Sequence, residues 1–191
     1  MQILLPSSEA VPFAKVGGLA DVVGSLPKAL RKLDVDARVI IPGYGFIDHL
    51  KYNISHLFKF DFYHRHGKSE INVYTCIYND IPFYLLQAWP YFGQEGTVYS
   101  HWDWDMERYI FFNQMVMSAM WELHHRLGWF PDVLHVNDWH TSLLPFLIHQ
   151  QRHVPEWSKL ATVISIHNIA YQGNHAGWFL YQAGIDGRDH P

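Results

Sequence analysis

A lysine and two adjacent glycines form the first group of residues with the chemistry of a binding site. Lys15, Gly17 and Gly18 come directly before a segment with helical periodicity. Glycine lets a backbone approach a ligand closely, and the amino terminus of a helix offers unpaired N–H groups and about half a positive charge. Together with the lysine, these groups predict a site for a diphosphate. The alternative is a tight turn between a strand and a helix, with a solvated lysine.

Asp138, Trp139 and His140 form a second group, in which a carboxylate, an indole and an imidazole follow one another. The hydroxyls of a sugar need hydrogen-bond acceptors and donors, whereas its C–H face packs against an aromatic ring. These side chains therefore indicate a sugar site. Two alternatives stay open: Asp138 as the N-cap of the following helix, which is compatible with ligand binding by His140, and Trp139 as a packing residue.

His167 and Asn168 form a third group, at the end of an apolar segment that is typical of a strand. A histidine that leaves such a strand is more often a hydrogen-bonded structural group than a residue that binds substrate. Its position favours the binding role, because all three groups follow predicted strands. If those strands are parallel, the three groups open onto the same space.

Other reactive arrangements are missing from the sequence. The spacing at Gly17 and Gly18 is not GxGxxG, and no GxxxxGK[ST] segment is present, so the dinucleotide fingerprint and the Walker loop are both absent. The 14 histidines include no HExxH or zinc-finger spacing, and the single cysteine, Cys76, excludes a thiolate cluster. No GxSxG segment marks a nucleophilic serine. We expect no metal site and no cofactor, and we expect Cys76 to be a small buried residue.

The hydrophobic pattern predicts the elements that position these groups. Short apolar runs predict strands at residues 3–5, 37–41, 132–136 and 160–166. Helical periodicity predicts helices at residues 19–33, 106–127, 141–151 and 178–183, the first of them kinked or loosened at Pro27. Period-two stretches predict antiparallel strands or hairpins between residues 54 and 87, with turns at residues 66–68 and 79–80, and a loop follows at residues 89–104.

Strands that alternate with helices are typical of a doubly wound α/β domain. We therefore predict a mostly parallel, Rossmann-like sheet with inserted antiparallel strands. In such sheets, ligands bind outside the carboxyl ends of the strands. The three groups are accordingly predicted to border one cleft.

Composition limits the classes of protein that fit. The chain has 191 residues, of which 49% are hydrophobic and 17% charged, so it carries a compact core and is neither disordered nor collagen-like. The formal net charge of −4 and the lack of a basic block argue against nucleic acid as a partner. The longest apolar run, residues 143–148, is far shorter than the ~20 residues of a membrane span, and the amino terminus lacks the features of a signal or transit peptide. With a lone cysteine, these features predict a soluble cytoplasmic protein without a membrane partner.

Three segments resemble one known family. Residues 1–27, with the run Lys15-Val16-Gly17-Gly18-Leu19, are similar to the amino-terminal signature of glycogen and starch synthases, the ADP-glucose-dependent glucosyltransferases. The runs at residues 135–140 (HVNDWH) and 167–173 (HNIAYQG) are similar to the second and third motifs of that family, in the same order and at fitting separations. The resemblance extends from residue 1 to about residue 174, with only general similarity between residues 50 and 88.

The resemblance implies a GT-B fold, in which two Rossmann-like domains face each other across a cleft. It implies retaining transfer of glucose from ADP-glucose to the nonreducing end of an α-1,4-glucan, so the partners are a sugar nucleotide and a glucan. Residues 1–191 would form the amino-terminal, acceptor-side domain, apparently truncated, with the second, nucleotide-binding domain absent. We therefore expect this chain to fold but not to catalyse alone. The sequence indicates no oligomeric state.

The resemblance also implies roles for individual residues. The expected catalytic residues are His167 and Asp138. The donor would be bound by Lys15, Gly17, Gly18 and Asn168, and the acceptor glucan by Tyr99, His140 and Trp139. Two departures concern acceptor contacts more than donor contacts: Gln94 stands where family members often carry arginine, and Asn137 replaces a frequent histidine.

Two other functions compete with this interpretation. In a noncatalytic glucan-binding module, the aromatic residues between positions 89 and 104 would hold polysaccharide together with Trp139. A nicotinamide-dependent oxidoreductase is disfavoured, because the GxGxxG fingerprint is absent. Calorimetry with maltooligosaccharides, together with whether the gene continues past Pro191, would separate the first alternative from the transferase, and titration with NAD would test the second.

Overall fold

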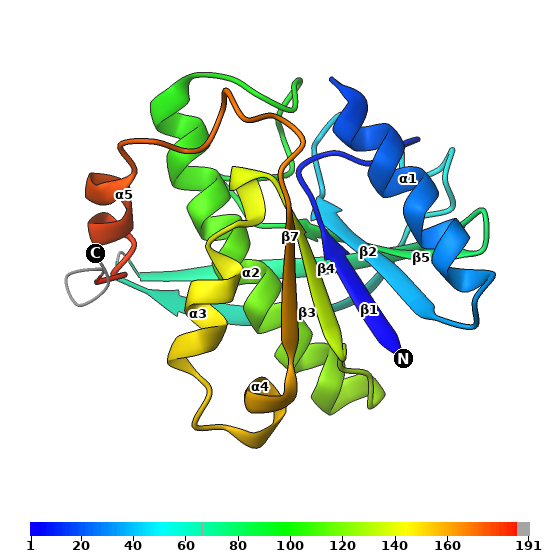
Figure 1. Cartoon of the computed structure of the whole chain (residues 1–191). Coiled ribbons are helices and arrows are strands. Elements are labelled where there is room, and N and C mark those ends of the chain that lie inside the picture. The colour runs from blue at the N-terminus through cyan, green and yellow to red at the C-terminus, as the bar shows by residue number, and fades with distance from the viewer. Residues whose placement is uncertain (66, 187–191) are drawn as a thin grey trace.

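One sheet of seven strands runs through the part of the chain that the computed structural model describes, residues 1–65 and 67–186. The strands are β1 (Gln2–Pro6), β2 (Asp36–Pro42), β3 (Ser55–His64), β4 (Gly67–Tyr78), β5 (Ile81–Gln87), β6 (Val133–Asn137) and β7 (Ala161–Ser165). Their order across the sheet is β3-β4-β5-β2-β1-β6-β7 (Figure 1). The sheet confirms the α/β architecture predicted from the sequence.

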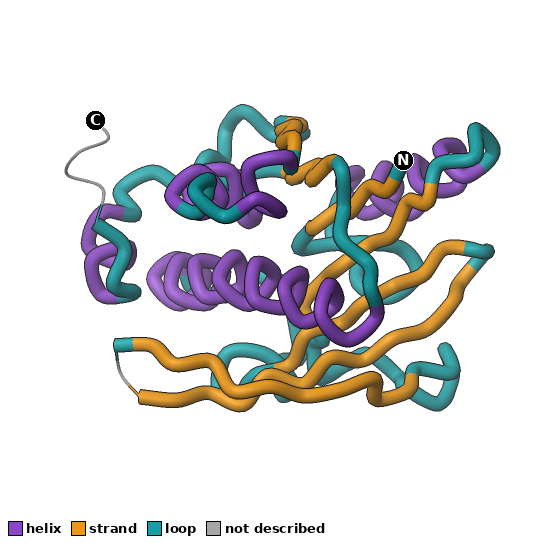
Figure 2. The backbone as a smooth tube through the Cα atoms, turned by 90° about the horizontal axis from the view of Figure 1, so that it is seen from below, coloured by secondary structure: helices purple, strands orange, loops and turns teal. Residues whose placement is uncertain are grey.

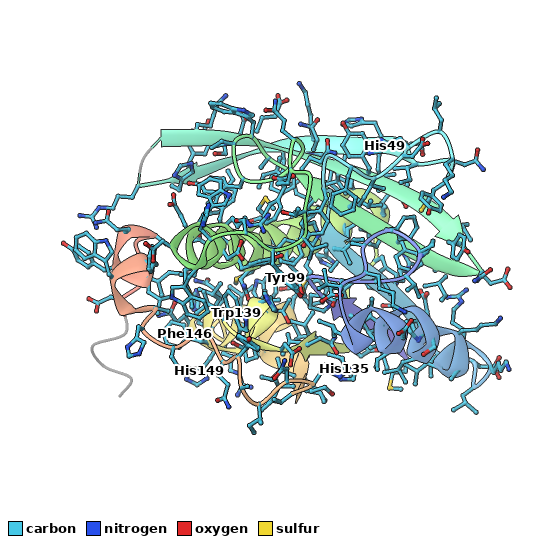
Figure 3. All side chains as sticks on the ribbon, turned by 90° about the horizontal axis from the view of Figure 1, so that it is seen from above. His49, Tyr99, His135, Trp139, Phe146 and His149 are labelled. Carbon is cyan, nitrogen blue, oxygen red and sulfur yellow. The ribbon has the colours of Figure 1, made fainter. Side chains whose placement is uncertain are left out.

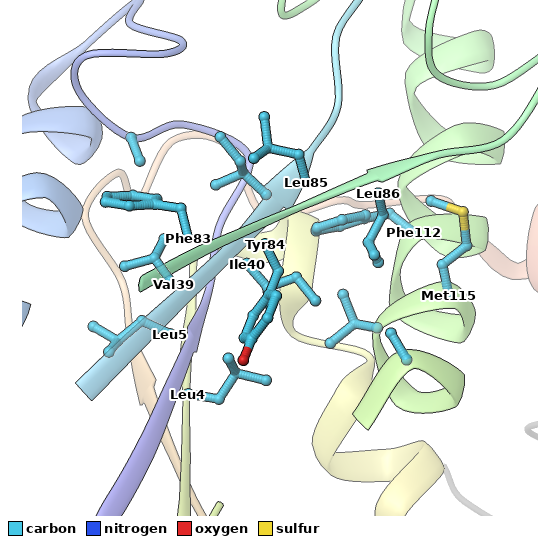
Figure 4. Close-up of a cluster of buried hydrophobic side chains, with 14 of the residues drawn as sticks. Leu4, Leu5, Val39, Ile40, Phe83, Tyr84, Leu85, Leu86, Phe112 and Met115 are labelled. Atoms are coloured by element: carbon cyan, nitrogen blue, oxygen red, sulfur yellow. The ribbon is translucent and has the colours of Figure 1, made fainter. Parts of the chain in front are cut away.

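The half of the sheet from β5 to β7 is parallel throughout. Its strands β1 and β2 are covered on both faces, and Leu4, Leu5 and Ile40 are fully buried. Figure 4 shows these side chains in one cluster with Phe112 of helix α2 (Trp102–Leu127). A strand that is buried on both faces reads as a continuous apolar run, which is why short apolar runs predicted β1 and β2.

The other half of the sheet is antiparallel. β3 pairs with β4 and β4 pairs with β5 in antiparallel register, which confirms the strands predicted between residues 54 and 87. The β4–β5 hairpin turns at Asn79 and Asp80, whose φ angles are 50° and 64°. Asn and Asp tolerate this left-handed backbone better than other residues with a Cβ. Part of the other predicted turn, at residues 66–68, lies outside the described residues.

Helices cover both faces of the sheet. Helix α1 (Gly18–Arg31) lies on one face, whereas α2 and α3 (Leu144–Gln150) lie on the other (Figure 2). This arrangement confirms the doubly wound fold. α1 continues past Pro27, which is buried. The short helix α5 (Gly177–Gln182) packs against α2. Its bounds lie within one residue of the helix predicted at residues 178–183.

Helix α2 begins earlier than predicted, at Trp102 instead of Met106, so the last part of the predicted loop at residues 89–104 is helical. Asp103 and Asp105 lie in its first turn, where the helix dipole stabilises carboxylates. The carboxylate of Asp105 also accepts a hydrogen bond from the backbone N–H of Ser100, at 2.9 Å. These acids initiate the helix before its apolar periodicity starts.

The predicted helix at residues 141–151 is interrupted. A short 3-10 helix at Trp139–Thr141 comes first, and α3 follows it. The hydroxyl of Thr141 bonds to the backbone N–H and C=O of Asn137, at 2.7 and 2.9 Å, and this local contact competes with helix formation. Helix α4 (Pro155–Lys159) was not predicted from periodicity, although Pro155 is suited to a first helical position.

β7 forms one edge of the sheet. Its successive residues Val163 and Ile164 point to opposite faces, and their exposed fractions are 47% and 50%. Ile166, just after the strand, is also exposed. Both faces of β7 are therefore open in the described structure.

Cys76 lies in β4 as a buried free cysteine. Burial raises the pKa of its thiol to about 11. A thiol that stays protonated is a poor nucleophile, so Cys76 has the character of the small buried residue expected from the sequence.

Candidate functional site

The three groups that the sequence singles out follow β1, β6 and β7. β1 lies between β2 and β6. From β1 the chain continues to β2 in one direction across the sheet, and from β6 it continues to β7 in the opposite direction. This is the topological switch point, and ligands of open α/β sheets bind outside it. Figure 3 looks down on this edge, with Tyr99 and Trp139 close to its centre.

The loop after β1 carries Lys15 and the glycine pair. A Cβ at Gly17 or Gly18 would have no neighbour within 4 Å, so the packing of the described chain does not require glycine at either position. The Nζ atom of Lys15 lies 2.7 Å from a carboxylate oxygen of Asp21 in an exposed ion pair. Such a pair contributes little to stability, so Lys15 can exchange Asp21 for an anionic ligand.

Glu9 organises this loop, and the sequence did not single it out. The residue is 3% exposed. Oε2 accepts hydrogen bonds from the backbone N–H groups of Val16 and Gly17, at 2.6 and 2.8 Å, and Oε1 accepts one from the hydroxyl of Tyr99, at 2.6 Å. Glu9 thus occupies N–H groups that the sequence interpretation left for a diphosphate. Gly18, which begins α1, is exposed and is not bound by Glu9.

Asp138 holds the loop after β7. Its Oδ1 atom accepts hydrogen bonds from the backbone N–H groups of His167 and Asn168, at 2.6 and 3.3 Å. Asp138 occupies the N-cap position of the 3-10 helix at Trp139–Thr141, but its side chain makes no capping hydrogen bond to that helix. The backbone of Asp138 has φ 55° and ψ −176°, a conformation that costs about 1–3 kcal/mol and occurs mainly at functional sites.

The ring of His167 is exposed and fixed from one side. Its Nε2 atom lies 2.9 Å from Oδ1 of Asn137, an acceptor, so Nε2 carries the proton and the lone pair of a neutral ring lies on Nδ1. The amide nitrogen of Asn137 in turn donates to the carbonyl of Pro6, at 3.2 Å. The structural contact expected for this histidine is therefore present, and it leaves the second ring nitrogen for a ligand.

Aromatic rings connect the loops. The rings of Tyr99 and His140 stack with centroids 5.0 Å apart, and the rings of His140 and Trp139 lie 4.1 Å apart. A Cβ at Gly173, where φ is +69°, would come within 3.0 Å of the Trp139 ring, so the loop after β7 packs directly against that ring. Trp139 also contacts Tyr109, which confirms the packing role that the sequence left open.

His140 is buried, and its electrostatics differ from those of His167. Burial, together with the charge of the buried Arg108, lowers the pKa of His140 to about 3. Its Nδ1 atom has no hydrogen-bond partner in the described part of the chain. This low pKa keeps the His140 ring neutral at physiological pH.

The structure brings the predicted residues to one edge. Asp138 binds the backbone at His167 and Asn168, Trp139 and His140 contact each other, and Tyr99 links His140 to the glycine loop through Glu9. The predicted convergence of the three loops is confirmed. Their catalytic, donor-binding and acceptor-binding roles remain predictions.

The described residues offer neither a metal-binding cluster nor a membrane-spanning helix. No group of three or more His, Cys, Asp or Glu residues there is arranged to hold a metal ion. No helix in residues 1–65 and 67–186 is long and apolar enough to cross a bilayer.

A doubly wound sheet with polar and aromatic side chains at its switch point defines a Rossmann-like ligand-binding domain. Residues 2–190 match the sequence profile of the family described as "Starch synthase catalytic domain". The chain belongs to this family, as the three motifs predicted.

Known relatives are named for glucan synthesis. The glycogen synthase of Caldicellulosiruptor saccharolyticus is 42% identical over 175 residues, which cover 91% of this chain and 35% of that protein. The glycogen synthase of Streptococcus sanguinis is 35% identical over 192 residues, covering 97% of this chain and 39% of that protein. The chain therefore spans little more than a third of the length of these relatives.

A solved structure has the same fold. The catalytic domain of Starch Synthase IV from Arabidopsis thaliana, bound to ADP and acarbose, superposes with a TM-score of 0.84 at 24% identity. The match covers 98% of this chain and 38% of that one. It confirms the fold class predicted from the sequence.

Proposed function

We propose that this chain is the acceptor-side part of a glycogen or starch synthase. The reaction is the retaining transfer of glucose from ADP-glucose to the nonreducing end of an α-1,4-glucan. One observation carries the proposal: the loops after β1, β6 and β7 meet through hydrogen bonds and ring contacts at one edge of the sheet. The names of the relatives, and the ADP and acarbose bound to the solved structure, support the substrate classes.

In this proposal, Lys15, Gly17 and Gly18 bind the diphosphate of the donor. Negative charge grows on the departing diphosphate during transfer, and a lysine beside the amino terminus of α1 is suited to stabilise it. The open space at both glycines supports this role, because a bound phosphate approaches a backbone that lacks Cβ atoms. No metal or other cofactor is needed if Lys15, the amino terminus of α1 and cations of the second domain together neutralise this charge.

His167 and Asn168 act at the transferred glucose, and Asp138 holds both of them in place. Positive charge grows on the sugar, and the free ring nitrogen of His167 accepts a hydrogen bond from a sugar hydroxyl. Asn168 contributes amide hydrogen bonds to the donor sugar. Asp138 positions both residues through their backbone N–H groups, so its contribution to catalysis is exerted through the loop that it holds.

Tyr99, His140 and Trp139 form the acceptor side. Their rings lie in contact, and the Tyr99 hydroxyl is fixed by Glu9. An aromatic surface packs against the C–H face of a glucose unit, and a neutral imidazole exchanges hydrogen bonds with its hydroxyls. We also propose a cytoplasmic location, because the lone cysteine, Cys76, suits a reducing compartment.

We propose that residues 1–191 form one of two domains, and that the domain absent from this chain completes the donor site. The test compares this chain with a full-length relative for incorporation of glucose from ADP-glucose into a maltooligosaccharide. The expected result is transfer by the complete enzyme, and binding of the maltooligosaccharide without transfer by residues 1–191. Turnover by this chain at the rate of the complete enzyme would refute the two-domain assignment.

A further inference from the structure

Helix α2 carries three buried polar side chains to which the proposed reaction gives no role. They are Asp105, Arg108 and Asn113, and Arg108 is fully buried. Arg108 and Asn113 follow Asp105 by about one and about two helical turns, so the three lie toward one side of the helix. Charged side chains are almost never fully buried without a partner. The partners of these residues therefore indicate what they do.

Arg108 and Asp105 form a buried ion pair. Nε and Nη2 of Arg108 donate to Oδ1 of Asp105, at 2.9 and 2.7 Å, and Nη2 also donates to the carbonyl of Val98. The carboxylate of Asp105 accepts hydrogen bonds from the backbone N–H and the hydroxyl of Ser100, at 2.9 and 3.0 Å. The hydroxyl of Tyr109 donates to the carbonyl of Val98 as well, at 2.8 Å. The ion pair is thus bonded to both chain neighbours of position 99.

Tyr99 lies between these two neighbours, in a segment with little other burial. Residues 96–97 and 100–101 are exposed. The Tyr99 hydroxyl nevertheless has to reach Glu9, at 2.6 Å, and its ring has to stack on His140, with centroids 5.0 Å apart. Exposed segments with few buried contacts open easily. The buried bonds on either side of Tyr99 are therefore suited to fix its backbone.

The third side chain, Asn113, holds the ring on which Tyr99 stacks. Its amide nitrogen donates to the carbonyls of His140 and Tyr109, at 2.8 and 2.6 Å, and its amide oxygen accepts from the backbone N–H of Leu144, at 3.0 Å. Both rings of the stack are thus held by polar groups of one helix. A rigid helix places such rings more precisely than an exposed loop does.

Stability alone does not account for the ion pair. Replacing a buried pair with apolar residues of similar volume is often neutral or stabilising, because the desolvation of two charges offsets their attraction. We propose that Arg108, together with Asp105, is a positioning residue that holds Tyr99 against His140 for the acceptor glucan. The glucan as the ligand of Tyr99 rests on the proposed function, whereas the placement of Tyr99 by the pair does not.

The first test measures, by NMR of this chain without ligand, the nuclear Overhauser effect between the rings of Tyr99 and His140. Arg108→Met removes the charge and the fork of donors, so the signal between the two rings should be lost. Arg108→Lys keeps the charge, but its ammonium is a point donor that cannot replace the fork, so the signal should be weakened. Circular dichroism shows whether each variant is folded. A folded Arg108→Met chain with the unmodified ring signal would overturn the proposal.

The second test measures the Kd of maltoheptaose by calorimetry. Arg108→Met should raise this Kd about tenfold, because Tyr99 loses its fixed position. If Arg108 acts through Tyr99, the same substitution should raise the Kd no further in a Tyr99→Ala chain. An equal increase in both backgrounds, or an unchanged Kd in Arg108→Met alone, would contradict a positioning role.

Arg126→Met is the matched control. Arg126 is also an arginine of α2 paired with an acid of the same helix, Glu122, at 2.6 Å, but this pair lies at the other end of the helix. The variant should keep the ring signal and the Kd of the unmodified chain, and losses equal to those of Arg108→Met would count against the proposal.

The remaining outcomes separate this proposal from the proposed function. Failure of both Arg108→Met and Arg108→Lys to fold would overturn the positioning role, since the pair would then be required by the fold as a whole. An unmodified chain that does not bind maltoheptaose would refute the acceptor role of Tyr99. The ring signal, which needs no ligand, would still decide whether the pair places Tyr99.

Discussion

Glu9 and Asp138 hold two loops of the same edge in the same way. Each is a buried carboxylate in which one oxygen accepts hydrogen bonds from two successive backbone N–H groups. For Glu9 these groups lie in the glycine loop after β1, and for Asp138 they lie in the loop after β7. Hydrogen bonds to a charged acceptor contribute about 1.5–3 kcal/mol each, so both carboxylates are strong determinants of loop position.

The surroundings of the two carboxylates differ. The second oxygen of Glu9 binds Tyr99, so Glu9 couples the proposed donor loop to the proposed acceptor surface. Asp138 adopts a strained backbone and holds residues at the exposed edge strand β7. The loop after β1 is therefore tied to the acceptor surface through Glu9, whereas the loop after β7 is held by Asp138, by the hydrogen bond between His167 and Asn137 and by packing against Trp139. This contrast predicts unequal effects of substitution.

The largest effect is expected for Asp138→Ala in a complete enzyme. Loss of both hydrogen bonds should reduce kcat/KM by at least a hundredfold, or about 3 kcal/mol, because His167 and Asn168 lose their fixed positions. Asp138→Asn retains an acceptor oxygen and should lose less activity. Steady-state kinetics with ADP-glucose would measure both variants. Equal losses in the two would contradict a positioning role and indicate that the negative charge itself takes part.

Lys15→Ala should reduce kcat/KM by about a hundredfold, because it removes one charge that stabilises the departing diphosphate. The exposed Lys15–Asp21 pair contributes little to folding, so the free energy of unfolding should stay within about 0.5 kcal/mol of that of the unmodified protein. Kinetics and urea unfolding of the same preparation measure the two quantities. An unchanged rate would remove Lys15 from the site.

Glu9→Gln should have a smaller effect, about tenfold in kcat/KM, because a neutral amide can still accept from the glycine loop and donate to Tyr99.

A double-mutant cycle with Tyr99→Phe sharpens the comparison with Asp138. Coupling of about 1 kcal/mol is expected between Glu9 and Tyr99, and none between Asp138 and Tyr99. Additive effects of Glu9→Gln and Tyr99→Phe would show that the two loops are independent.

The smallest expected effect is on the pH dependence of stability. The pKa of His140 is lowered to about 3 in the folded chain, whereas an unfolded histidine has a pKa of about 6.5, so the unfolded state binds more protons between these values. As the pH falls below about 6.5, His140 should lower the free energy of unfolding by up to ~1.4 kcal/mol per pH unit. His140→Gln should flatten this slope in urea unfolding between about pH 5 and about pH 7. The same slope in both proteins would contradict a neutral buried His140.

Much of the sheet could be predicted because its strands carry local signals. Buried apolar runs predicted β1 and β2, and turn residues such as Asn79 and Asp80 marked a hairpin. Apolar periodicity did not predict the start of α2, because acidic residues and not apolar ones mark its first turn. A short local contact of Thr141 likewise broke a helix that periodicity predicted as continuous.

Contacts between distant residues were harder to predict. The type of Asp138 suggested a cap to the helix that follows, but its partners lie 29 and 30 positions away along the chain. Glu9 was not singled out, because nothing in the sequence near it shows that its carboxylate is buried against Tyr99. A carboxylate directly after a buried strand, in a loop that ends in glycines, is the signal that could have identified it.

The open strand β7 has a practical consequence for handling this chain. The backbone N–H and C=O groups on its outer edge have no neighbouring strand in the described sheet. The side chains of Val163 and Ile164 beside them are half-exposed. Such a rim is a template for pairing with a second molecule, and native proteins normally blunt it with charge or proline. Concentrated solutions of the isolated polypeptide are therefore prone to self-association, and a lysine introduced at position 164 should raise its solubility.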